Sequence, residues 1–315
     1  MKRSSLLLTL LLALAACGTG EVVANTTTSQ DVTTTGEAST DFPVTIEADN
    51  GQVTVEERPD SIVSLSSTAT EMLFAIGAGP QVVAVDDQSN YPEEAPMTDL
   101  SGFTPNVEAI LSHEPDLVVI GYDPGELAAS LEATGVPVIN YPAAITIDDV
   151  YGQIEALGTV TGHSDEAAAV NETIADDLVE IAEEAPDATG VTYYHELDNT
   201  LYTATSRTFF GQIYALFGLE NIADAADEGG SAFGYPQLSS EYVVSADPDI
   251  IFLADTLYGE TAETVAARPG WEVLSAVQNG NVVEFDSDIA SRWGPRIVDF
   301  ARSVSDAIAA YSSQG

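Results

Sequence analysis

The chain of 315 residues has almost no basic side chains. Lys2 is its only lysine, and six arginines follow Cys17, against 51 acidic residues, so the formal net charge is −43. A body of this charge repels phosphate groups, which makes nucleic acid and anionic lipid surfaces poor partners. The composition is typical of an acidic, well-solvated surface suited to a saline exterior, and it says nothing about chemistry.

The chain has one cysteine, and its position is informative. The basic pair Lys2-Arg3 precedes the apolar run Leu6 to Leu14, which is too short to span a bilayer as a mature helix. Leu14-Ala15-Ala16-Cys17-Gly18 resembles the bacterial lipoprotein signal, in which cleavage leaves the cysteine as the lipid-bearing N-terminus. The alternative is an apolar leader with a stray cysteine.

We therefore expect a signal peptide over residues 1–16, lipidation at Cys17 and anchoring at the extracytoplasmic face of the cell membrane. After cleavage the mature chain would have no disulfide and no free thiol chemistry. Residues 17–42 are rich in Thr, Ser, Ala and Gly without apolar periodicity, which predicts a disordered tether.

Motifs for catalysis and cofactor binding are largely missing. No Gly-x-Gly-x-x-Gly follows a strand, and neither a phosphate-binding loop nor a nucleophile elbow is found. His113, His163 and His195 lie too far apart to indicate a zinc site. Carboxylates are abundant, so acid–base catalysis stays open, but spacing marks no pair. We therefore expect a binding protein, not an enzyme, without catalytic residues, bound metal or cofactor.

The middle of the chain, residues 146–186, is predicted to be a helical spine. Thr146 starts one apolar-periodic run, and residues 158–163 interrupt it. Ser164 is expected to be the N-cap of a second run, which Pro186 ends. At 1.5 Å per residue the spine would extend about 30 Å. The alternative is a long helix inside a single domain.

Short β runs alternate with helices on both sides of the spine, which indicates parallel sheets with right-handed crossovers. The predicted fold class is α/β, with two Rossmann-like lobes, residues 43–145 and 187–315, joined by a single long backbone helix. In the first lobe, Ile62 to Ser66 is expected to be the first strand, and Thr68 to Glu71 a capping box that opens a helix.

The two lobes share one short pattern. Glu108 lies seven residues before Pro115-Asp116, and Glu241 lies seven residues before Pro248-Asp249; a buried-type strand follows each time. Both glutamates are thus expected near the N-terminus of a helix, where the dipole favours acids. Acids in first turns are common in so acidic a chain, but the matched positions predict a pseudo-symmetric pair for a two-fold symmetric partner.

The loops after the predicted strands form a rim rich in aromatic residues, and in open α/β sheets ligands bind there. Aromatic side chains with a few polar groups suit a large, flat, partly apolar ligand. Arg207, Arg292 and Arg296 in or beside these loops suggest an anionic group on the ligand, with local salt bridges as the alternative. The predicted ligand-binding residues are Ser67, Tyr91, Phe103, Tyr122, His195, Arg207, Tyr235, Arg292 and Trp293.

From Ile62 to its end the chain resembles a known family, the substrate-binding proteins of ABC importers for iron complexes and vitamin B12, which have a single helical backbone between two lobes. The stretches that carry the resemblance are Ser64-Leu65-Ser66-Ser67-Thr68-Ala69-Thr70-Glu71, Ser89-Asn90-Tyr91-Pro92, Pro105-Asn106-Val107-Glu108, Glu220-Asn221-Ile222, Tyr235-Pro236-Gln237-Leu238 and Pro295-Arg296-Ile297.

The resemblance implies a monomeric receptor that captures a metal chelate (cobalamin, a ferric siderophore or haem) and delivers it to an ABC permease dimer. It also implies that Glu108 and Glu241 dock on arginines of the permease and that the lobes close little around the ligand. Gln88 stands where corrinoid-binding members have an aromatic residue, and Phe103 and Tyr235 stand at or near tryptophan positions. An extracytoplasmic enzyme on a similar scaffold and a signalling receptor are the alternatives.

Overall fold

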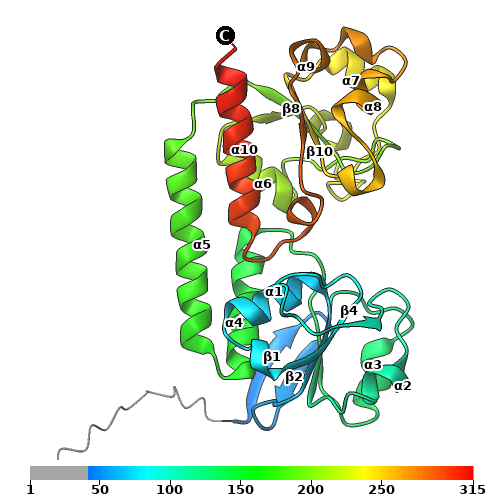
Figure 1. The fold of residues 1–315 in the computed structure, drawn as a ribbon, viewed down its shortest axis with the longest axis vertical. Coiled ribbons are helices and arrows are strands. Elements are labelled where there is room, and N and C mark those ends of the chain that lie inside the picture. The colour runs from blue at the N-terminus through cyan, green and yellow to red at the C-terminus, as the bar shows by residue number, and fades with distance from the viewer. Residues whose placement is uncertain (1–41, 315) are drawn as a thin grey trace, which may run out of the picture. The chain divides into compact units, whose positions relative to one another are not determined.

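The computed structural model describes residues 42–314, which belong to one compact unit (Figure 1). The predicted signal peptide, Cys17 and all but the last residue of the predicted tether lie outside the described residues. The described part begins with an antiparallel hairpin, β1 (Val44–Ala48) and β2 (Gly51–Val55). The prediction that Ile62 begins the first strand is therefore wrong. Asp49-Asn50 forms the turn, and Gly51, which begins β2 opposite Ala48, has a φ of +102°, which glycine adopts without strain.

The first lobe is built on a five-stranded parallel sheet in the order β5-β4-β3-β6-β7. Helices α1 and α4 cover one face, and α2 and α3 the other. The bounds of the elements that this paragraph adds are β3 (Ile62–Leu65), α1 (Ser67–Ala75), the 3₁₀ helix η1 (Gly79–Gln81), β4 (Val82–Asp86), β5 (Met97–Leu100), α2 (Val107–Leu111), β6 (Leu117–Ile120), α3 (Leu127–Glu132), β7 (Val138–Asn140) and α4 (Ile147–Thr161).

The second lobe is built on a four-stranded parallel sheet in the order β11-β10-β8-β9. Helices α6 and α10 pack on one face, and α7, α8 and α9 on the other. Its elements are β8 (Thr192–Glu196), α6 (Phe209–Ala215), β9 (Glu220–Asn221), α7 (Ser240–Ala246), β10 (Ile250–Leu253), α8 (Ala262–Ala266), α9 (Ser275–Asn279), β11 (Val282–Glu284), α10 (Ile297–Ser312) and the 3₁₀ helices η2 (Asp224–Asp227), η3 (Thr256–Tyr258), η4 (Trp271–Val273) and η5 (Ile289–Ser291).

Helix α5 (Ser164–Glu184) is the long backbone helix between the lobes, and Figure 1 draws it beside α4 and α10. At 1.5 Å per residue its 21 residues span about 31 Å. Helix α4 begins against α6, where the backbone N–H of Ile147 donates to Gln212, and ends on the first lobe, where Arg58 donates to the carbonyl of Thr161. The predicted fold class, two Rossmann-like lobes with parallel sheets on one long helix, is confirmed.

Helix boundaries inside the spine differ from the prediction. Gly158 does not interrupt α4, which continues to Thr161. A Cβ at this position would lie 2.4 Å from the Cβ of Ala167, so glycine allows α4 and α5 to approach closely. The break is confined to Gly162, with a φ of +76°, and His163, which occupies the N-cap position of α5 in place of Ser164.

The predicted capping box at residues 68–71 is also wrong. Helix α1 begins at Ser67, and the side chain of Ser66 caps it by accepting the backbone N–H of Ala69. Glu71 is thereby released from a capping role and turns inward, where it is 3% exposed. No helix within residues 42–314 combines the length and apolar character needed to cross a lipid bilayer.

Candidate ligand cleft between the lobes

A cleft of about 530 Å³ lies at the carboxyl ends of the strands and is lined by both lobes. This volume falls within the range of small-molecule sites. The first lobe contributes the start of α1 and the loops after β4, β5, β6 and β7, and the second lobe the start of α6 and the loops after β8, β10 and β11. The residues that line it are Leu65, Ser66, Ser67, Thr68, Asp86, Gln88, Gly102, Phe103, Gly121, Tyr122, Ala143, Ala144, Leu197, Phe209, Phe210, Tyr235, Ala254, Leu257, Tyr258, Ser287, Asp288, Ala290, Ser291, Arg292 and Trp293.

Six of the nine predicted ligand-binding residues line this cleft: Ser67, Phe103, Tyr122, Tyr235, Arg292 and Trp293. Phe103 and Tyr122 are largely exposed, at 70% and 57%. A large apolar surface left open to water gains free energy when a ligand covers it, at about 25 cal/mol per Å². The exposed aromatic rings are therefore available for a ligand with an extended apolar face.

His195 does not reach the cleft, so its predicted place on the rim is wrong. The side chain is fully buried, its Nδ1 lies 2.8 Å from the hydroxyl of Tyr214, and its ring stacks on Phe210 at 5.4 Å between centroids. Burial lowers the pKa of His195 to about 3, so the imidazole is neutral at physiological pH. Since Phe210 lines the cleft, His195 lies one layer behind the surface.

Arg207 and Tyr91 also lie outside the lining. Arg207 pairs with Asp227 at 2.8 Å, and the same carboxylate accepts the backbone N–H groups of Ala232 and Gly234. These contacts, the backbone N–H of Ala232 first, hold the pKa of Asp227 below its usual value. Tyr91 packs its ring against the guanidinium of Arg296, at 4.3 Å from the ring centroid. Local pairing thus accounts for Arg207.

The two tyrosines at the start of the second lobe belong to the core. Tyr193 and Tyr194 are both buried, and they point to opposite faces of the sheet as neighbours in a strand must. Burial raises the pKa of both hydroxyls above their ordinary value. Because they face opposite sides of the sheet, they cannot both contact one ligand.

Phe209, Phe210 and Asp86 line the cleft without having been expected there. The aromatic pair begins α6 directly after its N-cap Thr208. In a parallel α/β unit the start of a helix lies at the carboxyl edge of the sheet. Two adjacent aromatic residues at a predicted helix start therefore indicate a place in the cleft lining. Asp86 ends β4, and burial raises its pKa while a hydrogen bond from Ser89 opposes this.

Glu108 and Glu241 are both exposed and both lie in the first turn of a short helix. Asn106 caps α2 and Ser239 caps α7 by accepting a backbone N–H, so the two helix starts are built alike. Each glutamate closely follows a residue of the cleft lining, Phe103 or Tyr235. The two carboxylates therefore belong to the same edge of the molecule as the mouth of the cleft.

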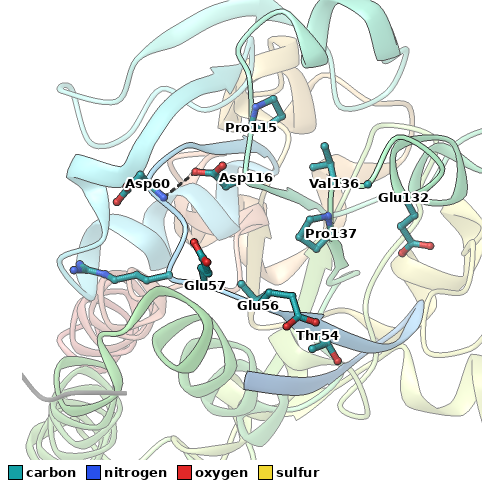
Figure 2. A pocket seen from close by; sticks show the side chains of 12 residues that line it. Thr54, Glu56, Glu57, Asp60, Pro115, Asp116, Glu132, Val136 and Pro137 are labelled. Carbon is teal, nitrogen blue, oxygen red and sulfur yellow. Dashed lines mark hydrogen bonds between the residues drawn. The ribbon is translucent and has the colours of Figure 1, made fainter. Parts of the chain in front are cut away.

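A second hollow, of about 620 Å³, lies at the opposite, amino-terminal edge of the first sheet (Figure 2). Figure 2 shows Asp116 next to Asp60, whose backbone N–H it accepts at 3.0 Å, and the carboxylates of Glu56, Glu57 and Glu132 around the opening. Within residues 42–314 no three acidic, histidine or cysteine side chains are grouped so that they could hold a metal ion. This acidic edge has neither aromatic rings nor a contribution from the second lobe, so the interlobe cleft is the candidate site.

Two parallel-sheet lobes on one backbone helix, with an aromatic cleft between them, define a ligand-binding protein of the periplasmic type. Residues 62–289 match the periplasmic binding protein family, and the chain belongs to that family.

Individual relatives agree with this assignment. The chain is 30% identical to the uncharacterized ABC transporter substrate-binding lipoprotein YvrC of Bacillus subtilis, over 85% of this chain and 86% of that protein. It is 33% identical to a cobalamin-binding protein of Halobacterium salinarum, over 82% of this chain and 72% of that protein. Among solved structures it is similar to the periplasmic vitamin B12 binding protein BtuF of Vibrio cholerae, with a TM-score of 0.63, 28% identity, and coverage of 82% of this chain and 99% of that one.

Proposed function

We propose that this protein is the extracytoplasmic, lipid-anchored substrate-binding protein of an ABC importer, which captures a metal chelate in the interlobe cleft and delivers it to the permease. The observation that carries the proposal is the aromatic cleft shared by both lobes of a periplasmic binding protein. A corrinoid is the first candidate ligand, because the relatives from Halobacterium salinarum and Vibrio cholerae are named for cobalamin or vitamin B12. Ferric siderophores and haem are the other chelates to test.

The cleft suits binding without turnover. Its polar groups are mainly hydroxyls of serine and threonine, and its titratable side chains are Asp86, Asp288, Arg292 and tyrosines. Asp288 and Arg292 pair with each other at 2.9 Å, which leaves neither poised as an acid, base or nucleophile. We propose accordingly that the protein is not an enzyme and that it carries no cofactor of its own; the chelate is its cargo.

The two tryptophans of the chain offer a direct binding assay. Trp293 lines the cleft, whereas Trp271 is buried in the core of the second lobe at 1% exposure. Cyanocobalamin should quench the emission of Trp293, in the cleft, more strongly than that of Trp271, so the Trp293→Phe variant should lose much of the signal although calorimetry still detects binding. If neither assay detects binding of cyanocobalamin, haemin or a ferric siderophore, the proposed function is wrong.

We propose that Glu108 and Glu241 dock the receptor on basic residues of a permease dimer. Their matched capped helix starts, one in each lobe beside the cleft mouth, support a partner with two-fold symmetry. The double variant Glu108→Ala/Glu241→Ala should abolish cellular uptake of labelled cyanocobalamin while the affinity for the ligand stays unchanged.

Glu263 supplies the matched control for that experiment. It also lies exposed in the first turn of a capped helix of the second lobe, α8, but the helix that precedes β7 in the first lobe, α3, has no acid in its first turn. Glu263→Ala should leave uptake intact. Loss of ligand affinity in the double variant would contradict the docking role, and equal loss of uptake in Glu263→Ala would contradict the pairing of Glu108 with Glu241.

Anchoring at Cys17 and a monomeric state complete the proposal. Cys17→Ser should release the protein from the membrane fraction, and the released protein should sediment as a monomer with unchanged ligand affinity. Retention of the variant in the membrane fraction would argue against the lipid anchor.

A further inference from the structure

The cleft has one basic side chain in its lining, and two acids neutralise it. Of the basic residues in the described part of the chain, only Arg292 lines the cleft. Its NH1 lies 2.8 Å from Oε1 of Glu71, and its NH2 lies 2.9 Å from Oδ1 of Asp288 and donates to the carbonyl of Gln88 at 3.1 Å. The Arg292 side chain is only 6% exposed. Its charge therefore serves the protein and not a ligand.

The same cluster extends away from the cleft with its charges balanced. Arg296 donates to both oxygens of Glu71, at 2.9 and 2.6 Å. The two negative charges of Glu71 and Asp288 thus balance the two positive charges of Arg292 and Arg296. Asp86 adds a further carboxyl group to the lining. The sum over the cleft is thus neutral to negative, inside a chain of net charge −43.

From this arrangement we infer that the cleft selects its chelate by charge: it binds uncharged or cationic chelates, rejects anionic ones, and Asp288 sets the preference. The inference rests on the proposed function and narrows its ligand class. The charged side-chain donors that replace the lost hydration of a carboxylate are chiefly Arg and Lys. The one such donor that the described residues place in the cleft lining, Arg292, is already paired with carboxylates of the protein.

Asp288 acts on the ligand more directly than Glu71 does. The side chain of Asp288 is 33% exposed and itself lines the cleft, whereas that of Glu71 is 1% exposed behind Arg292. A carboxylate on a bound ligand would face Asp288 across a few ångströms in a site partly shielded from water. At an effective dielectric constant near 20, repulsion of this kind weakens binding by about tenfold or more.

Cyanocobalamin and a monocarboxylic acid obtained from it by hydrolysis of one side-chain amide test the inference, because they differ by one negative charge on nearly the same shape. Affinities for both are measured by calorimetry at low salt for the full chain and two variants. The wild type should bind the acid about tenfold more weakly than the amide. Asp288→Asn should bring the two affinities within about twofold, since the asparagine can still accept the hydrogen bond that Asn90 donates to Asp288 at 2.8 Å.

Asp87→Asn is the matched control, because Asp87 is an exposed acid next to the cleft but outside its lining. It should preserve the tenfold difference. Equal or tighter binding of the acid by the wild type, or an unchanged difference in Asp288→Asn, would overturn the inference and leave the proposed function standing. If no corrinoid binds, an uncharged ferric trihydroxamate and an anionic ferric tricatecholate provide the same comparison; failure of all four ligands and of haemin refutes the proposed function itself.

Discussion

The two lobes share one arrangement of residues, the shared frame, and differ in the charged side chains that they bury beside it. In both lobes a capped helix with an exposed glutamate leads to Pro-Asp and a buried strand, and the aspartate then binds the backbone at the start of the neighbouring strand. Asp116 accepts the N–H groups of Asp60 and Ser61, and Asp249 accepts the N–H and hydroxyl of Thr192. The repeated aspartates therefore connect two neighbouring strands at the amino-terminal edge of each sheet.

The buried cluster of charged side chains at the carboxyl edge of the second sheet has no counterpart among the described residues of the first. Glu196 is fully buried and receives Arg268 in a bidentate contact at 2.6 and 2.5 Å, and Arg268 also reaches Glu260. Asp255 lies in the same cluster, 1% exposed, with no hydrogen-bond partner for either carboxylate oxygen among the described residues. The strand β6 of the first lobe instead leads to the exposed Tyr122. The frame around Pro-Asp is thus common to both lobes, whereas the second lobe adds a buried charge cluster.

The largest expected effect is on this buried cluster. Arg268→Leu removes the partner of Glu196 and leaves a carboxylate buried without compensation, which typically costs about 3–5 kcal/mol. Urea denaturation should show this loss of unfolding free energy. The matched change at an exposed pair, Asp177→Asn opposite Arg302, should cost less than about 1 kcal/mol. Equal effects would show that the cluster does not stabilise the second lobe.

The next effect concerns pH. Burial, with the nearby Glu196 second and Glu260 adding to it, raises the pKa of Asp255 to about 7, while Arg268 opposes the shift. The folded state thus holds this proton more tightly than the unfolded state, so the stabilisation is complete below the unfolded pKa near 4 and is lost as pH rises through 7. The unfolding free energy contributed by this group should fall on the order of 4 kcal/mol between pH 4 and 8.

Asp255→Asn isolates this contribution, because the amide has nearly the same shape and no charge to bury. The difference in unfolding free energy between the wild type and Asp255→Asn should change steadily from pH 4 to 8 and level off above pH 8. A difference that is constant across this range would show that Asp255 does not titrate there.

The shared frame predicts a matched pair of effects. Asp116→Ala and Asp249→Ala each remove the acceptor of two donors at a strand start, exposed in the first lobe and partly buried in the second, at a cost of about 0.5–1.5 kcal/mol. The two losses should agree within about 0.5 kcal/mol if the sites are equivalent, and they should add in the double variant because the sites are far apart in the fold. A large cost in one lobe alone would break the equivalence.

The smallest effect on stability is expected at the two glutamates beside the cleft. Glu108→Ala and Glu241→Ala remove exposed side chains for which the structure shows no hydrogen bond or salt bridge within residues 42–314. Thermal unfolding should therefore be indistinguishable from that of the wild type for either variant. A clear loss of stability would assign the glutamate to the fold and weaken the case for docking.

Local pattern was sufficient for most of the elements. Most strands of the two sheets and the repeat around Glu108 and Glu241 followed from short-range apolar runs, caps and Pro-Asp pairs, since these features act within a few residues; the edge strands β5 and β9 did not. The hairpin β1–β2 was missed despite the Asp49-Asn50 turn and the glycine that follows it. The local pattern predicts a helix stop at Gly158. In the structure this glycine makes room for Ala167 of the neighbouring helix, a contact that local sequence does not reveal.

The cleft was only partly predictable for the same reason. Loops at the carboxyl ends of strands supplied Phe103, Tyr122, Tyr235 and Trp293, because strand polarity alone places them at that edge. His195 met the same criterion, yet Phe210 covers it in the folded protein.

What the amino-acid sequence determined by itself was the alternation of strands and helices, the acidic surface and the matched glutamates, all of which depend on composition and near neighbours. The tertiary structure alone decided the pairing of charges. Arg292 and Arg296 find Glu71 more than 220 residues away in the chain, at separations of 221 and 225 residues. The chain has few basic side chains, and a buried charge without a partner is costly, so the arginine of the cleft pairs with an acid of the protein. This long-range pairing leaves no free basic side chain among the described residues of the cleft lining for an anionic ligand.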